Sequence, residues 1–256
     1  MKRTDIFKYL CYTANLIADS EYGNKFILKG DSVLVTRVLE LNRPDLYRLT
    51  SDLDIHCDKQ EVWDRFCSEV VDLLNNNDRG YEYYLVKRRS LEKPMNNSDS
   101  LTFRLVTEDD VIEFKMDMNI KSNSIITAEF STALNMKTYD AMTMLSDKVV
   151  AVSSRAVYRR AKDLYDIYVI MSMYSFNIRN LQEYIKLKHP DANLTNMLVG
   201  ENYTDIEHAY ERYEGISNKP LLQVLFTSVQ SFLQPVYMGV SSGLVWDSKQ
   251  GRWLDC

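Results

Sequence analysis

Apolar residues recur with two different periods along this chain, and the change from one to the other divides it. Before about residue 135, short apolar runs and runs with an apolar residue at every second position predict β-strands. These runs cover residues 26–28, 51–57, 81–89, 101–106 and 111–120. Spacings of three and four predict helices at residues 6–17, 31–39 and 60–74.

After about residue 135, the helical spacing dominates. It covers residues 139–154, 161–174, 181–187 and 221–232. Segment 92–100 contains Pro94 and two asparagines, and we expect an exposed loop there. The pattern predicts an α+β protein, with a strand-rich domain at 1–135 and a mainly helical domain at 136–256.

Composition excludes several classes of protein. Of the 256 residues, 45% are hydrophobic and 26% are charged, the balance of a folded globular chain. The formal charge of −5 gives no global reason to bind nucleic acid, so such a site has to be a local patch. Four scattered cysteines, Cys11, Cys57, Cys67 and Cys256, form no C-x-x-C pair and favour a reducing compartment.

No apolar stretch reaches the roughly 18 residues of a membrane helix. Lys8 and Asn15 interrupt the first apolar stretch, and no small-residue cleavage site follows it, which argues against a signal peptide. We therefore expect a cytoplasmic protein with no membrane association.

Two features of the front part suggest phosphate and metal chemistry. Gly30 follows a short strand and precedes a helix, where free N–H groups can bind an anion and glycine permits close approach. Asp52 and Asp54 lie two apart on a strand and share one face. Two neighbouring carboxylates repel each other unless a cation lies between them, and Mg²⁺ is usually held by such carboxylates with substrate phosphates.

A third carboxylate is expected on strand 111–120. Glu113, Lys115, Asp117 and Asn119 share one face, opposite an apolar face. Asp117, which lies between two methionines, is the preferred third metal ligand, and Glu113 is the alternative. His56 extends the face of Asp52, but Mg²⁺ prefers oxygen ligands, so a structural or solvent-facing role is expected for this histidine.

The order of these motifs resembles that of a known family. The segments FILKG at 26–30, RLTSDLD at 48–54, DKVVAVSSR at 147–155 and RAKDLYDIY at 160–168 are similar to those of the AbiEii/AbiGii-type nucleotidyltransferase toxins, of the polymerase-β-like superfamily. Near the end, Pro235 in an expected short loop and Trp246 and Trp253 around a charged turn also look like that family.

The resemblance implies a nucleotidyltransferase fold, in which a mixed sheet flanked by helices precedes a mainly helical part. It implies an NTP as co-substrate and Mg²⁺, or Mn²⁺, held by Asp52, Asp54 and Asp117. It assigns nucleotide binding to seven residues: Lys29, Gly30, Asp31, Ser32, Thr50, Ser51 and Lys148. The acceptor would be tRNA or another cellular target, and an antitoxin protein would balance the toxin.

One position departs from the family. A second glycine or a serine usually follows the first glycine, whereas Asp31 stands here. A carboxylate beside a triphosphate is repulsive, but at a helix N-terminus it is favourable. A pocket-facing Asp31 would weaken nucleotide binding or activity, and a capping Asp31 would not.

By resemblance, Lys148 is a catalytic lysine that offsets charge on the triphosphate, and Asp163 or Asp166 is the acid close to it. The residues alone allow a second interpretation, in which Arg159–Asp163 and Lys162–Asp166 are i,i+4 pairs that support a helix.

Two local basic clusters could contact an RNA backbone, or could be solvated surface. They are formed by residues 87–89 and by Arg155, Arg159, Arg160 and Lys162.

The leading hypothesis is a metal-dependent transfer of a nucleotidyl group from an NTP to an acceptor hydroxyl. One alternative is a catalytically silent nucleotide- or partner-binding protein on the same fold, which Asp31 favours. Another is a transferase for a small molecule such as an antibiotic.

Overall fold

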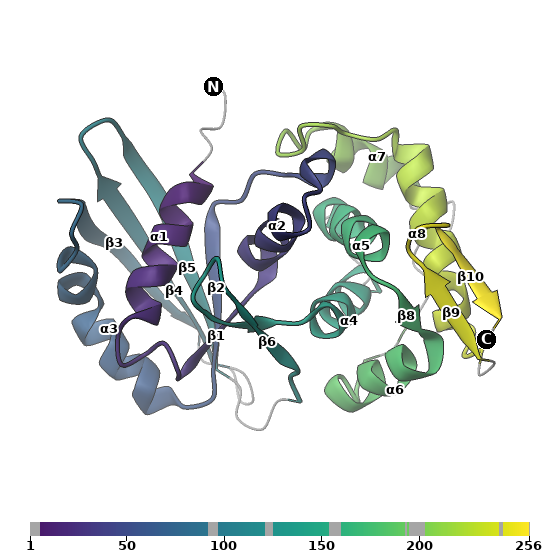
Figure 1. Cartoon of the computed structure of the whole chain (residues 1–256), viewed down its shortest axis with the longest axis horizontal. Coiled ribbons are helices and arrows are strands. Elements are labelled where there is room, and N and C mark those ends of the chain that lie inside the picture. Colours follow the sequence, from purple (N-terminus) through teal and green to yellow (C-terminus); the bar gives the residue numbers. More distant parts are fainter. Residues whose placement is uncertain are drawn as a thin grey trace. The chain divides into compact units, whose positions relative to one another are not determined.

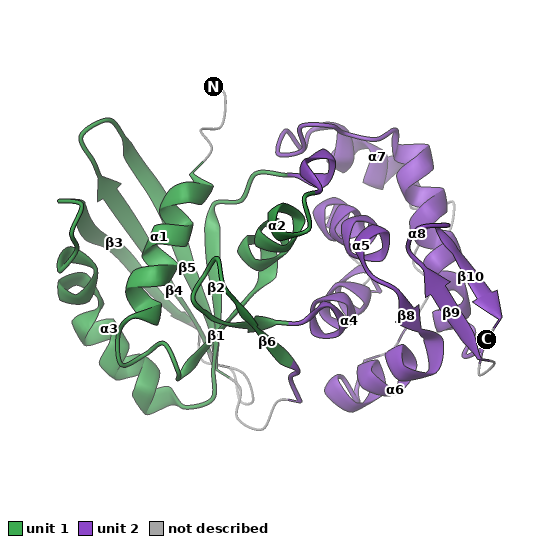
Figure 2. Ribbon diagram, in the orientation of Figure 1, with its two compact units in different colours: residues 1–42, 48–124, 128–139 green, residues 43–47, 125–127, 140–256 purple. Residues whose placement is uncertain are grey.

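The computed structural model describes residues 6–91, 97–120, 125–153, 160–192, 194, 203–240 and 243–255. Within them the chain forms two compact units (Figures 1 and 2). The first comprises residues 1–42, 48–124 and 128–139, and the second comprises 43–47, 125–127 and 140–256. The expected boundary at residue 135 falls in a hairpin whose second strand still belongs to the first unit.

The first unit is built on a seven-stranded mixed sheet in the order β3-β4-β5-β2-β1-β7-β6. Its strands are β1 (Phe26–Lys29), β2 (Asp52–Cys57), β3 (Glu82–Leu91), β4 (Asn97–Val106), β5 (Val111–Ile120), β6 (Ala128–Ser131) and β7 (Met136–Tyr139). β2 pairs with β5 in parallel and with β1 in antiparallel orientation. The α+β fold with a mixed sheet is therefore confirmed.

One face of this sheet is apolar because its strands alternate as the sequence indicated. Leu53 and Ile55 of β2 and Met116 of β5 are fully buried on it. Helices α1 (Phe7–Ala18) and α3 (Gln60–Asn75) cover this face, and α1 meets it where Thr13 hydrogen-bonds Tyr83 of β3. α2 (Gly30–Glu40) packs against β1, β2 and β7.

The second unit is mainly helical, as expected. It contains η1 (Pro44–Leu46), α4 (Ala141–Val152), α5 (Ala161–Met173), α6 (Ile178–Lys188), α7 (Tyr203–Glu211), α8 (Leu222–Tyr237) and a small sheet of β8 (Phe176–Asn177), β9 (Leu244–Asp247) and β10 (Arg252–Asp255). α5 packs against α4, α7 and α8. Trp246 and Trp253 are opposite each other in the β9–β10 hairpin, and both rings contact Phe232 of α8.

Three details differ from the sequence interpretation. Residues 97–100 belong to β4 rather than to a loop, because β4 pairs with all ten residues of β5; residues 92–96 lie outside the described part. Pro235 lies inside α8 rather than in a loop. It falls near the C-terminal end of the helix, so the hydrogen bond that it cannot donate to the carbonyl of Ser231 is lost close to where the helix stops. The short strands β6 and β7 were not predicted, because four-residue runs carry little periodic signal.

Strand alternation places the side chain of Arg88 on the helix-covered face of the sheet and those of Lys87 and Arg89 on the opposite face. The Arg88 guanidinium donates to the Asp99 carboxylate at 2.7 and 3.0 Å, and Trp63 Nε1 of α3 donates to the same oxygen at 2.9 Å. Asp99 is 4% exposed, so its charge depends on these donors.

We expect Arg88→Ala to lower the free energy of unfolding by about 2 kcal/mol, because it leaves a buried carboxylate short of donors. Arg89→Ala is the matched control, since Arg89 makes no ion pair with a described side chain, and its effect should stay within about 0.5 kcal/mol. Urea unfolding measures both, and equal effects would contradict the assignment.

Candidate active site

The turn between β1 and α2 brings backbone close to a carboxylate. β1 ends at Lys29, and Gly30 begins α2 with a φ of +71°, a conformation that favours glycine. A Cβ at Gly30 would overlap the Asp54 carboxylate. Glycine is therefore required here twice, by its dihedral angle and by the closeness of Asp54.

The pairing of β2 with β5 places two of the predicted carboxylates side by side. Asp54 is the register partner of Asp117, and Leu53 is the register partner of Met116. Neighbouring strands lie about 4.8 Å apart. At that separation, two full negative charges repel by about 3 kcal/mol at an effective dielectric constant of about 20. The pair therefore favours a cation between its oxygens.

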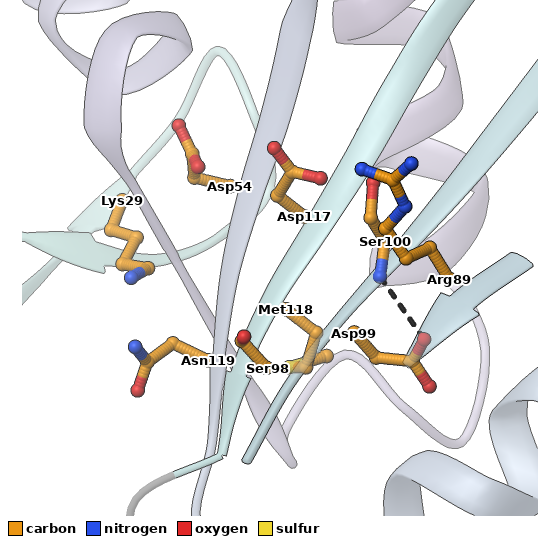
Figure 3. Close-up of a pocket in the computed structure, with 9 residues that line it drawn as sticks. All are labelled: Lys29, Asp54, Arg89, Ser98, Asp99, Ser100, Asp117, Met118 and Asn119. Atoms are coloured by element: carbon orange, nitrogen blue, oxygen red, sulfur yellow. Dashed lines mark hydrogen bonds between the residues drawn. The ribbon is translucent and has the colours of Figure 1, made fainter. Parts of the chain in front are cut away.

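The same row continues across five strands. Lys29 is opposite Asp54, and Ser100 is opposite Asp117. Arg89 is opposite Ser100, so the row carries a cation at each end and two carboxylates in the middle. Figure 3 shows this order, with Lys29 on one side of the acids and Arg89 on the other.

A pocket of about 370 Å³ opens over this row. It is lined by Lys29, Asp54, Arg89, Ser98, Asp99, Ser100, Asp117, Met118 and Asn119 (Figure 3). Ser98, Ser100 and Asn119 were not singled out by the sequence. The only available signal was alternation on β5, because the pairing of β4 with β5 cannot be read from spacing.

Asp52 lies one row further along the sheet. Its register partner on β5 is Lys115, and Ser51 Oγ donates to its carboxylate at 3.2 Å. Among the residues that the structure describes, no three His, Cys, Asp or Glu side chains are grouped as a metal site. The structure thus brings Asp54 and Asp117 together and leaves Asp52 beside them on the same face.

Of the two candidates on β5, Glu113 lies away from the pocket. It is exposed and pairs with Arg104 of β4 at 3.0 Å. His56 shares the face of Asp54 but is 2% exposed, and its Nε2 lies 2.9 Å from the Asp58 carboxylate. This arrangement agrees with the structural role expected for His56.

Asp31 is not a bare carboxylate. Its Oδ1 lies 2.7 Å from a guanidinium nitrogen of Arg48, and both side chains are buried. Arg48 comes from the segment that leads into β2, so the pair joins the first turn of α2 to the strand of Asp52 and Asp54. The extra negative charge beside Gly30 is therefore balanced by a partner within the fold.

Two hydroxyl groups near these residues in the sequence are buried without a hydrogen-bond partner in the described chain. They belong to Ser32, in the first turn of α2, and to Thr50, two residues before Asp52. Buried polar groups normally have partners, so these two hydroxyls call for a partner outside the chain, such as an ordered water or a bound ligand.

The predicted residues of the second unit form a cluster of their own. Lys148 of α4 lies 2.7 Å from Asp163 and 2.6 Å from Asp166, both on α5. Asp163 also lies 3.4 Å from Arg160. Both acids contact the lysine, so the structure does not select one of them. Arg155 and Arg159 lie outside the described residues, so the expected Arg159–Asp163 pair also lies outside them.

The comparisons with known proteins agree with the fold. The family model for the nucleotidyl transferase AbiEii toxin of type IV toxin-antitoxin systems matches residues 14–237. A crystal structure of JHP933 from Helicobacter pylori is similar with a TM-score of 0.55 and 15% identity, over 91% of this chain and 90% of that one. A proposed nucleotidyltransferase from H. pylori gives the same score and identity, over 91% and 94%. No curated protein sequence matches significantly.

The protein is a nucleotidyltransferase. It belongs to the AbiEii nucleotidyl transferase toxin family, as the resemblance of its motifs indicated. The family places it among the toxins of toxin-antitoxin systems, which implies a cognate antitoxin. No described helix is both long and apolar enough to cross a membrane.

We expect Gly30→Ala to abolish nucleotidyl transfer and to lower the free energy of unfolding by about 1–2 kcal/mol, because of the left-handed backbone alone. Gly80→Ala is the matched control, since Gly80 also has a positive φ of +66° but no atom lies within 4 Å of its added Cβ. Transfer assays and urea unfolding compare the two. Similar loss of transfer in both variants would show that contact with Asp54 is unimportant.

A pH dependence follows from Asp147 of α4. Burial disfavours its charge, but the hydrogen bond from His189 and the charge of Lys188 outweigh burial and lower the pKa of Asp147 to about 2. The unfolded value is about 3.9, so this group stabilises the fold above about pH 4, and the stabilisation is lost as the pH falls towards 2.

Asp147→Asn should therefore reduce the dependence of stability on pH between about 5 and 2. Thermal unfolding followed by circular dichroism at several pH values measures this. Asp191→Asn, which removes an exposed carboxylate, is the control. If the stability of Asp147→Asn fell with pH below about 5 as steeply as that of wild type, the lowered pKa would not belong to Asp147.

Proposed function

We propose that this toxin transfers a nucleotidyl group from an NTP to an acceptor hydroxyl of RNA, with tRNA as the leading candidate, and that the reaction depends on Mg²⁺. The observation that carries the proposal is the placement of Asp54 beside Asp117 above the Gly30 turn. The family and the fold are consistent with it.

The carboxylates fit a hard divalent cation. Asp54 and Asp117 offer oxygen ligands from adjacent strands, and Asp52 offers a further carboxylate on the same face. Mg²⁺ bound there would offset the charge of the phosphates and make the acceptor hydroxyl easier to ionise. Mn²⁺ accepts the same oxygen ligands.

The residues around Gly30 suit the donor phosphates. The first N–H groups of α2 have no partner within the helix and carry partial positive charge. The Ser32 and Thr50 hydroxyls supply further buried donors, and Ser51 and Lys29 flank the carboxylates. In this proposal Asp117 would accept the proton of the attacking hydroxyl.

Lys148 would help neutralise the charge that develops on the pyrophosphate leaving group. Its ammonium contacts Asp163 and Asp166, which hold the side chain in place. In this role the two acids orient the lysine rather than contact substrate.

The alternative of a catalytically silent protein was based on the charge of Asp31. The Arg48 partner at 2.7 Å offsets that charge, which favours the active enzyme. A small-molecule acceptor remains the second alternative, and the acceptor panel below distinguishes it.

The test uses labelled NTPs, total RNA and small hydroxylated acceptors, with and without Mg²⁺. Wild-type protein should label RNA only with the metal. Asp54→Asn and Asp117→Asn should each lower transfer by at least about 100-fold, the scale of removing one electrostatic or acid–base group. They should also lose the increase in Tm that Mg²⁺ produces in wild type, because they bind the ion less tightly.

Glu113→Gln is the control, because it neutralises an acid on the same strand and face that pairs with Arg104. It should retain transfer and the metal-dependent Tm. NTP binding without turnover would support the silent protein instead, and labelling of small acceptors alone would support the antibiotic-type enzyme. Full transfer by Asp54→Asn would exclude Asp54 from the site.

A further inference from the structure

The sheet face that holds Asp117 continues outwards as a surface with exposed cations. Arg89 of β3 lies in the row of Asp117, and Lys87 lies in the next row, with Thr102 and Lys115. We call Lys87, Arg89 and Lys115 the basic face. All three are exposed, and none makes an ion pair with a described side chain.

The two faces of β3 differ in whether their basic side chains are neutralised. Arg88 lies between Lys87 and Arg89 in sequence but points to the helix-covered side, where Asp99 neutralises it. On the pocket side, the described ion pair of Arg104 with Glu113 has no net charge. The basic face thus retains three positive charges in a protein whose formal charge is −5.

An aromatic side chain lies on the same surface. Tyr84 is the register partner of Arg104 and is 50% exposed. Exposed aromatic rings beside cations are typical of surfaces that bind single-stranded nucleic acid, since bases stack on the ring and phosphates meet the cations.

We propose that the basic face binds the phosphate backbone of a single-stranded RNA end and leads its terminal hydroxyl to Asp117. The inference rests on the proposed function, because it takes RNA as the acceptor. The two sides of the pocket then have different tasks. The donor phosphates lie towards Gly30 and α2, and the acceptor approaches from β4 and β3.

The geometry favours RNA over another polyanion. Arg89 is two strands from Asp117, about 10 Å at normal strand spacing. A chain that contacts Arg89 and Lys87 with its last phosphates can therefore place its end at the carboxylates. An acidic protein could meet the cations, but it offers no terminal ribose hydroxyl.

A structural reason for charged residues on β3 also exists. β3 is an edge strand, and charges there prevent pairing with other sheets. Protection of an edge, however, gives no reason for RNA affinity, so RNA binding separates the two explanations.

The test compares Lys87→Gln/Arg89→Gln with Lys8→Gln/Lys59→Gln in the full chain. The control pair removes the same charge from exposed lysines in α1 and before α3. Binding of a fluorescent single-stranded RNA is measured by anisotropy at several salt concentrations. Transfer assays give KM for RNA and for NTP.

Losing two phosphate contacts should make the slope of the log association constant against log salt less negative by about 1.4. It should also weaken RNA binding about tenfold at 0.15 M salt. KM for RNA should rise by a similar factor, while KM for NTP and Tm stay as in wild type. The control pair should match wild type in every measurement.

Each other outcome is decisive. RNA affinity and salt slope equal to wild type in the Lys87→Gln/Arg89→Gln variant would overturn the inference and leave the proposed function standing. Wild-type protein that binds RNA through the basic face but transfers nothing to it would overturn the proposed function, and with it the role of the RNA end as acceptor, while RNA binding by the basic face would stand. Displacement of RNA by polyglutamate at equal charge concentration would show a site for acidic proteins and would also overturn the inference.

Discussion

The site depends on the parallel pairing of β2 with β5. This pairing puts the carboxylates of Asp54 and Asp117 on adjacent strands, where they repel each other. The fold accepts the repulsion because the apolar sides of the same strands, including Leu53 and Met116, are fully buried. Hydrophobic burial thus holds two like charges together, which makes the position suitable for a divalent cation.

The two sides of the carboxylate pair differ in structure. On one side, Gly30 brings the start of α2 against Asp54 and leaves no room for a side chain. On the other side, Ser100 and Arg89 continue the row towards an exposed edge.

Asp31 shows how a departure from a family pattern can be accommodated. A carboxylate next to the glycine turn would repel phosphates if it stood alone. Its pairing with the buried Arg48 converts the charge into a link between α2 and the segment before β2. A buried pair of this kind is costly to break, because either partner would be left as an unpaired charge.

Local patterns alone were sufficient for several elements. β5 occupies residues 111–120 as expected, and the helix at 60–74 extends by one residue in α3. The strict alternation in β2 placed Asp52 and Asp54 on one face, because successive side chains of a strand point to opposite sides. These properties depend on neighbours in the sequence, which is why they could be read without a structure.

Only the tertiary structure decided which distant residues meet. Asp117 rather than Glu113 lies beside Asp54 because a parallel register aligns them, and a shift of four residues would have placed Glu113 there instead. The pairing of Arg88 with Asp99, and the pairing of Asp31 with Arg48, likewise depend on which strands and segments pack together. Register and packing are set by the burial of the whole sheet, and that information is not contained in any single segment of the sequence.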